Sequence, residues 1–219
     1  ACLEAGIPAR EVPRSRALSM ERALDPALRR AVLVPDAAMD AFRVPLCFFA
    51  AARRLGADIR PFWRVTGLES HGGRVCAVRA RSLAAGREER IAADYVVNAA
   101  GAWAAGVGAL AGVVVPVTPA AGTMVAARGR LTEAVISRLH PAGDGDIIVP
   151  QRGLSIVGST QWTAASPDAL APRPGEVRHL LALADAMVCG FSSRPHHAAW
   201  SAARPLFGRS EASGRAVSR

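Results

Sequence analysis

The chain has 219 residues, of which 51% are hydrophobic and 21% charged, and this composition excludes an intrinsically disordered protein. All 27 positive residues are arginine, and together with 18 acidic residues they give a formal net charge of +9. Because the arginines are spread along the chain without interleaved aromatic residues, we interpret the charge as a compositional bias and expect no nucleic-acid partner. The sequence indicates a soluble globular protein.

The cysteine and histidine pattern gives no sign of a metal site or a disulfide framework. The four cysteines lie far apart without a C-x-x-C pair, as is typical of a protein in a reducing cytoplasm. The adjacent His196 and His197 would point in different directions on a strand or a helix. No signal peptide is recognised at Ala1. Residues 95–127 carry no charge, but glycine and proline residues divide them into short elements, so we expect no membrane helix.

The first third of the chain shows helical and strand patterns in alternation. Its predicted elements are a helix over residues 16–30 interrupted at Asp25-Pro26, a strand over 31–35, a helix over 42–55 with Asp40 as its cap and Gly56 as its stop, and a strand over 59–68.

A hairpin and a buried strand are predicted next. Two alternating runs, residues 74–81 and 88–91, flank a turn that contains Gly86. Residues 94–100 are nearly all apolar, as in a strand that is buried on both faces, and they lead through Gly101 into a helix over 102–110.

The remaining residues predict an antiparallel sheet with helices. The predicted strands cover residues 113–117, 123–127, 147–149 and 154–158, and a short helix capped by Thr132 covers 132–139. A longer helix over 174–188 presents one apolar face. Residues 195–205 then lead to an arginine-rich tail. The predicted apolar face consists of Val177, Leu180, Leu181, Ala184, Met187 and Val188.

Residues 106–111 satisfy the G-x-G-x-x-G/A dinucleotide pattern in letters. In a phosphate-binding loop the glycines form the turn between strand and helix. Here the predicted strand ends near Ala100, which places Gly106 and Gly108 inside the following helix. We therefore interpret these glycines as close-packing positions.

Several short segments resemble a known family. The string V-V-N-A-A-G-x-W at residues 96–103 is similar to a flavin-contacting segment of the FAD-dependent oxidoreductases of the D-amino-acid oxidase superfamily. Further strings resemble the FAD-dependent glycerol-3-phosphate dehydrogenases in order and approximate spacing, and most of all the large subunit of the anaerobic bacterial form. They are V-P-D at 34–36, D-A-F-R at 40–43, D-G-D-I-I-V-P at 144–150, G-S-T at 158–160 and R-P-L at 204–206.

The resemblance implies an α/β (α+β) fold, with a partial Rossmann-like FAD domain that carries a β-hairpin insertion and an antiparallel-sheet substrate domain. Residues 1–38 would belong to the substrate or cap region, 39–112 to a partial FAD-binding domain and 113–205 to the substrate domain. Residues 206–219 would begin the return to the FAD domain. We expect an internal fragment that lacks the N-terminal G-x-G-x-x-G strand, and we expect this chain alone to bind FAD weakly or not at all and to be inactive.

The resemblance also implies an activity and a set of site residues. The activity is oxidation of sn-glycerol 3-phosphate by FAD, with electrons passed to a quinone through partner subunits, in a cytoplasmic protein that can lie at the inner membrane. Arg204 matches an arginine on the substrate side of the flavin, where its planar guanidinium suits an anionic phosphate or the oxygen undergoing oxidation. The residues that match cofactor-contacting positions are Val65, Asn98, Ala99, Ala100, Gly101 and Trp103.

The chain also departs from the family pattern. Ala121 stands where the family can have a lysine, and no histidine is assigned as general base. Two other interpretations remain open: another FAD-dependent amino-acid or hydroxy-acid oxidoreductase, and a truncated module without catalytic activity.

Overall fold

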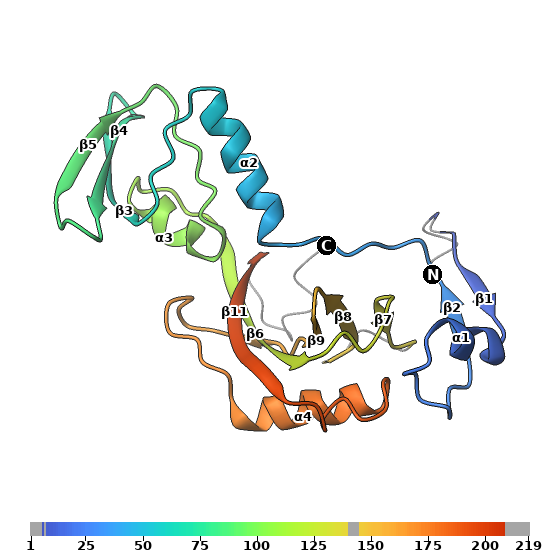
Figure 1. The fold of residues 1–219 in the computed structure, drawn as a ribbon. Helices are drawn as coiled ribbons and strands as arrows, with labels where there is room; N and C mark the ends of the chain where they lie inside the picture. Colours follow the sequence, from blue (N-terminus) through green and yellow to red (C-terminus); the bar gives the residue numbers. More distant parts are fainter. Residues whose placement is uncertain (1–5, 7, 140–144, 209–219) are drawn as a thin grey trace. The chain divides into compact units, whose positions relative to one another are not determined.

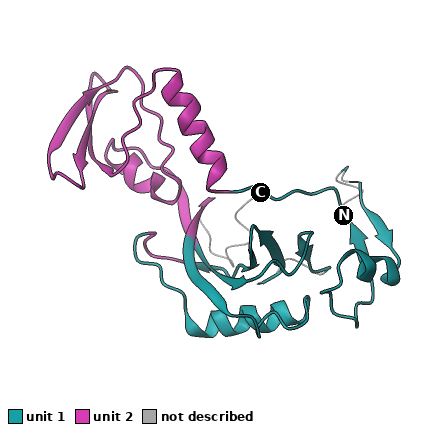
Figure 2. Ribbon diagram, in the orientation of Figure 1, with its two compact units in different colours: residues 1–40, 121–162, 168–202 teal, residues 41–120, 163–167, 203–219 magenta. Residues whose placement is uncertain are grey.

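The structure is a computed structural model, and it describes residues 6, 8–139 and 145–208. The chain forms two compact units, which Figure 2 shows in different colours. Unit 1 comprises residues 1–40, 121–162 and 168–202, and unit 2 comprises residues 41–120, 163–167 and 203–219. Each unit is therefore assembled from three separate stretches of the chain.

Unit 1 is built around an antiparallel sheet in the order β10-β6-β9-β8-β7, with β11 also paired to β6 (Figure 1). This confirms the predicted antiparallel sheet and the mixed helix and strand class. The first residues of β6 and the last residues of β11 belong to unit 2. The strands are β6 (Val117–Arg128), β7 (Ile136–Ser137), β8 (Ile147–Gln151), β9 (Leu154–Gly158), β10 (Trp162–Thr163) and β11 (His196–Phe207).

The core of unit 1 lies between this sheet and helix α4 (Pro174–Asp185). The helix was expected to reach residue 188 and ends three residues earlier, but its predicted apolar face is confirmed. Leu180, Ala184 and Val188 are completely buried, and Val177 and Leu181 pack at the edge of the cluster. The buried cluster consists of Val125, Ala127, Ile148, Val157, Leu180, Ala184, Met187, Val188 and Phe191.

The N-terminal part of unit 1 pairs β1 (Arg10–Val12) with β2 (Ala31–Leu33) in antiparallel fashion, and helix α1 (Arg14–Met20) lies between them in the chain. Strand β2 confirms the strand predicted over 31–35. The helix predicted over 16–30 is wrong in its extent, because Glu21 turns inward directly after α1. Its carboxylate accepts hydrogen bonds from the amides of Glu133, at 2.9 and 3.1 Å, and of Ala134, at 2.5 Å.

Two predictions for the sheet of unit 1 are wrong in detail. No helix forms over residues 132–139, because Ile136 and Ser137 instead pair with β8, and Thr132 is buried rather than capping. Strand β6 (Val117–Arg128) confirms the strand predicted at 123–127, but the strand predicted over 113–117 is wrong, because residues 113–116 form no strand. Pro119 can lie in this strand because only its carbonyl is needed there, and that carbonyl accepts a hydrogen bond from the amide of Ala164 at 2.9 Å.

Unit 2 contains helix α2 (Arg43–Arg54) and an antiparallel sheet in the order β3-β4-β5 (Figure 1). Helix α2 confirms the prediction over 42–55, although Phe42 occupies its N-cap position and Asp40 lies two residues earlier. The predicted hairpin is confirmed by β4 (Arg74–Ser82) and β5 (Glu88–Ala92). Strand β3 (Trp63–His71) begins later than expected and joins β4 through Gly72 and Gly73, whose φ angles of 57° and 77° suit a tight hairpin turn.

The strand predicted over residues 94–100 does not form. These residues have no hydrogen-bonded neighbour strand in the described part of the chain, and Tyr95 and Val97 are 84% and 87% exposed. A strand needs a partner for its backbone ladder, and an apolar sequence alone does not supply one. The helix predicted next is confirmed as η1 (Gly101–Trp103) followed by α3 (Ala104–Ala109).

Strand β11 was not predicted. Its sequence is rich in alanine and contains Pro205, so it lacks the β-branched residues that mark most strands. It is a strand because β6 offers it a partner. The arginine-rich tail over 209–219 and Asp144 of the string at 144–150 lie outside the described residues. Within the described ranges, no helix is both long and apolar enough to cross a membrane.

Candidate functional site

The turn between the apolar segment at 94–100 and helix α3 is held by the side chain of Asn98. Its Oδ1 accepts a hydrogen bond from the amide of Ala100 at 3.2 Å, and its Nδ2 donates to the carbonyl of Ala104 at 2.9 Å. The first contact is the local turn that asparagine commonly makes with the backbone two residues on. Asn98 therefore fixes both ends of the turn, which is a structural reason for an asparagine at this position.

Apart from the half-exposed Trp103, the outer surface of this turn consists of backbone and small side chains. Gly101 has a φ of 55°, a conformation that favours glycine, and a Cβ placed there would meet no atom within 4 Å. Ala99 is exposed and Ala100 is half-buried, while Trp103 is 50% exposed. A flat ring can approach such a backbone closely, so the turn fits a planar cofactor.

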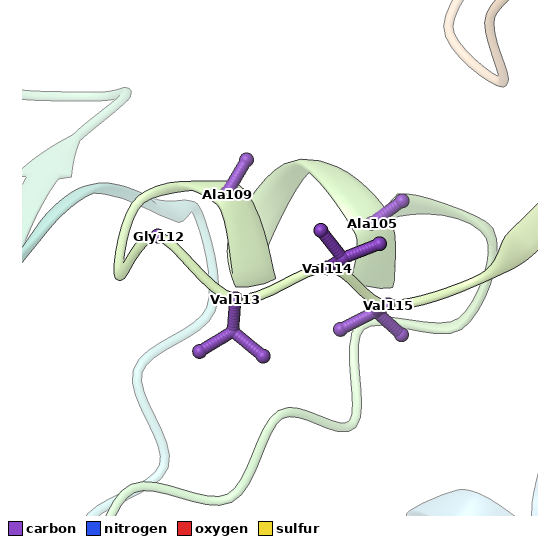
Figure 3. A pocket seen from close by; sticks show the side chains of 6 residues that line it. All are labelled: Ala105, Ala109, Gly112, Val113, Val114 and Val115. Atoms are coloured by element: carbon purple, nitrogen blue, oxygen red, sulfur yellow. The ribbon is translucent and has the colours of Figure 1, made fainter.

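Helix α3 follows this turn and borders a hollow of about 380 Å³. Figure 3 shows the segment from Gly112 to Val115 passing beside the helix, with only carbon atoms in the side chains that line the hollow. Such a lining suits an apolar group and offers no side-chain donor or acceptor. The lining residues are Ala105, Ala109, Gly112, Val113, Val114 and Val115.

The two glycines of the G-x-G-x-x-A string both lie inside α3, as expected, and not in a strand-to-helix turn. A Cβ on Gly108 would lie 2.6 Å from Cγ2 of Val115 and 2.8 Å from the carbonyl oxygen of Val113. Gly108 is thus a close-packing position, as predicted. Gly106 has no atom within 4 Å of such a Cβ, so close packing does not explain it.

The other two predicted site residues lie on strands. Val65 is in β3, opposite Ala80 of β4, and is exposed. Arg204 lies near the end of β11 and is also exposed. The structure thus gathers the residues from Asn98 to Trp103 into one turn, whereas Val65 and Arg204 belong to separate elements.

A cluster of hydroxyl groups around one carboxylate in unit 1 was missed in the sequence. Oε2 of Glu176 lies 2.5 Å from Oγ1 of Thr123 and 3.2 Å from Oγ1 of Thr160. Oγ of Ser201 lies 3.0 Å from the Thr123 hydroxyl, and the Thr123 amide donates to Oγ1 of Thr160 at 2.9 Å. These four residues come from β6, the loop after β9, helix α4 and β11, and no local pattern links them.

The described residues contain no group of three or more His, Cys, Asp or Glu side chains that could hold a metal ion. The thiols of Cys47, Cys76 and Cys189 are free. His196 and His197 are both exposed on β11.

Comparison with known proteins defines the class. A family model described as FAD dependent oxidoreductase matches residues 1–218, so the chain belongs to this family, as the resemblance implied. The chain is 38% identical over 176 residues to an anaerobic glycerol-3-phosphate dehydrogenase subunit of Haloferax volcanii, and 38% identical over 160 residues to the corresponding subunit from Escherichia coli K12. These alignments cover 76% and 73% of this chain but only 30% of each relative, so the chain spans about a third of their length.

Solved structures support the same fold. Glycine oxidase from Geobacillus kaustophilus is 27% identical, with a TM-score of 0.77 over 94% of this chain and 53% of its own. Glycerol-3-phosphate dehydrogenase from Bacillus halodurans, solved with FAD, is 21% identical, with a TM-score of 0.73 over 91% of this chain and 44% of its own. The relatives from H. volcanii and E. coli are named as subunits, so the chain is similar to one component of an assembly.

Proposed function

We propose that this chain provides the substrate sheet and part of the flavin domain of a FAD-dependent dehydrogenase that oxidises sn-glycerol 3-phosphate to dihydroxyacetone phosphate. The observation that carries the proposal is the 38% identity to the same subunit of anaerobic glycerol-3-phosphate dehydrogenase in two organisms. Residues 39–112 are assigned to the FAD side and residues 113–205 to the substrate side. The electrons pass onward to a quinone through partner subunits at the inner membrane.

FAD, when bound, supplies the acceptor for the hydride that leaves the alcohol carbon. The turn from Asn98 to Trp103 contacts the flat cofactor through its backbone and small side chains. Asn98 holds this turn in shape, because its side-chain amide is already hydrogen-bonded to the backbone at both ends of the turn. Val65 contributes an exposed apolar side chain from β3 to the same cofactor.

Arg204 is assigned to the substrate. Its guanidinium is planar and permanently charged, so it can bind a phosphate through two parallel hydrogen bonds or stabilise the oxygen undergoing oxidation. The chain supplies no histidine that we assign as general base.

The function is tested in a chimera in which this chain replaces the matched segment of the E. coli relative. We expect bound flavin, seen as visible absorbance, and reduction of an artificial electron acceptor with sn-glycerol 3-phosphate but not with glycine. Glycine is the competing substrate because the solved glycine oxidase is 27% identical. Turnover of glycine alone would replace the proposed substrate by an amino acid, and a folded chimera without flavin would refute the cofactor contact.

The role of Arg204 is tested in the same chimera. Arg204→Ala should lower kcat/KM while flavin content stays full, because a charge-assisted contact to a bound anion is lost. The expected loss of transition-state stabilisation is about 2–4 kcal/mol. Arg204→Lys should recover part of the rate, since the ammonium keeps the charge without the planar fork. Arg87→Ala, at an exposed position before β5, serves as the control. Full activity of Arg204→Ala would refute the proposed substrate contact and leave Arg204 with a structural role only.

A further inference from the structure

The hydrogen bonds around Glu176 have a fixed direction. A carboxylate offers acceptors only, so both threonine hydroxyls at its Oε2 must donate to it. The Thr123 hydroxyl has one hydrogen, which is used in this bond, and therefore Ser201 donates in the 3.0 Å contact between them. The chain of donors runs from Ser201 through Thr123 to Glu176, and every member is ordered by the carboxylate at its end.

A second set of contacts holds the carboxylate itself. Nη1 of Arg173 lies 3.6 Å from Oε1 of Glu176, and the Arg173 guanidinium lies 4.4 Å from the ring centre of Trp162. Glu176 is also in the first turn of α4, where the helix end favours a negative charge. Oε2 thus accepts hydrogen bonds from hydroxyl groups and Oε1 faces a cation, so both carboxylate oxygens have a stabilising partner.

The cluster joins segments that the resemblance singled out separately. Thr160 ends the G-S-T string, and Thr123 directly follows the P-A-A-G string that contains Ala121. The amide of Thr123 donates to the Thr160 side chain at 2.9 Å, and the amide of Thr160 donates to the Thr123 carbonyl at 3.2 Å. Ser201 lies on β11, three residues before Arg204.

We propose that Glu176 is a positioning residue of the substrate sheet: its carboxylate fixes β6, the Gly158–Thr160 segment and β11 relative to one another. Thr123 is completely buried and Thr160 nearly so, so water has little access to replace the lost acceptor. The catalytic consequence of this positioning rests on the proposed function, in which this sheet binds the substrate.

The first test uses this chain alone and needs neither flavin nor substrate. Amide hydrogen exchange is measured in wild type, Glu176→Ala, Glu176→Gln and the control Glu133→Gln. Glu133 pairs with Arg130 at the same i,i+3 spacing but is 78% exposed, which makes it a matched control. Glu176→Ala should speed exchange of the Thr123 and Thr160 amides about tenfold. Glu176→Gln should restore protection, because its carbonyl oxygen can accept the same hydroxyl bonds.

The outcomes of this test are distinct. A faster exchange confined to Thr123 and Thr160, rescued by glutamine and absent in Glu133→Gln, supports positioning. Equal acceleration across β8 and β9 would mean global destabilisation and would overturn the proposal, as would unchanged exchange in Glu176→Ala. If Glu176→Ala does not fold, Glu176→Asp keeps the charge but shortens the side chain, which withdraws the carboxylate from both threonine hydroxyls; it must then speed exchange of the Thr123 and Thr160 amides, and unchanged exchange in this variant would overturn the proposal.

The second test is kinetic and uses the chimera. Glu176→Ala should lower kcat for sn-glycerol 3-phosphate about tenfold with unchanged flavin content, and Glu176→Gln should recover most of it. Locally faster exchange with unchanged kcat would overturn the role in the reaction. A chimera that binds flavin but does not oxidise sn-glycerol 3-phosphate would instead refute the proposed function, and hydrogen exchange would then decide the positioning role by itself.

Discussion

The carboxylate of Glu21 should be a major local source of stability in unit 1, and Glu21→Ala tests this. Glu21 is 8% exposed and accepts the amides of Glu133 and Ala134, which lie 112 and 113 residues later in the chain. Hydrogen bonds to charged groups contribute about 1.5–3 kcal/mol each. Two such bonds would contribute about 3–6 kcal/mol. Glu133 and Ala134 are themselves exposed, so water can partly replace the lost acceptor, and we expect a loss at or below the lower end of this range, about 2–3 kcal/mol for the pair.

The assay is thermal unfolding followed by calorimetry. For a chain of this length, about 1 kcal/mol shifts the midpoint by roughly 2–4 °C, so Glu21→Ala should lower Tm by about 4–12 °C. The Tm of Glu21→Gln should fall between those of the wild type and Glu21→Ala, because its amide keeps one acceptor oxygen. Glu133→Ala removes an exposed carboxylate and should change Tm little. A Glu21→Ala protein that melts with the wild type, or a Glu133→Ala protein that loses as much, would refute this reasoning.

Three further predictions concern single positions. Gly108→Ala should destabilise the chain by about 1–3 kcal/mol in urea unfolding because its Cβ meets the following segment, whereas Gly106→Ala, with open space, should stabilise α3 by up to about 1 kcal/mol. The hydrogen bond and charge of Arg30 lower the pKa of Glu11. The stabilisation from this pair is therefore present above the ordinary pKa of a glutamate and is lost as the pH falls through the lowered pKa. Arg30→Ala should raise the pKa of Glu11 in an NMR titration. Asn98→Asp keeps the acceptor of the turn but places a carboxylate oxygen against a carbonyl, and it should cost about 1–2 kcal/mol and weaken flavin binding in the chimera.

Local patterns predicted the elements whose stabilising contacts are close in sequence. The apolar face of α4 and the hairpin of β4 and β5 are visible as periodicity, and both form where expected. Strand β11 was missed because its strand character comes from pairing with β6, which lies about 80 residues earlier in the chain. Pairing also explains why residues 94–100 form no strand. Their composition is suitable, but a neighbouring strand is absent from the described residues.

The candidate site divides in the same way. The turn from Asn98 to Trp103 is one contiguous string, so its resemblance to a flavin-contacting segment is visible in the sequence. The cluster around Glu176 joins residues 16, 53 and 78 positions apart, and a single sequence contains no signal for such contacts. The hydrogen bonds from the amides of Glu133 and Ala134 to Glu21 could not be predicted for the same reason, since these residues are 112 and 113 positions apart.

The way β6 and β11 run through the molecule limits how its two units can be separated. The boundary after residue 120 falls inside β6, and the boundary after residue 202 falls inside β11, so both lie within hydrogen-bonded strands and not in loops. No contiguous stretch of sequence encodes either unit. A protease that cuts only exposed loops would therefore release neither unit as an intact body, and genetic recombination could not exchange one unit as a cassette.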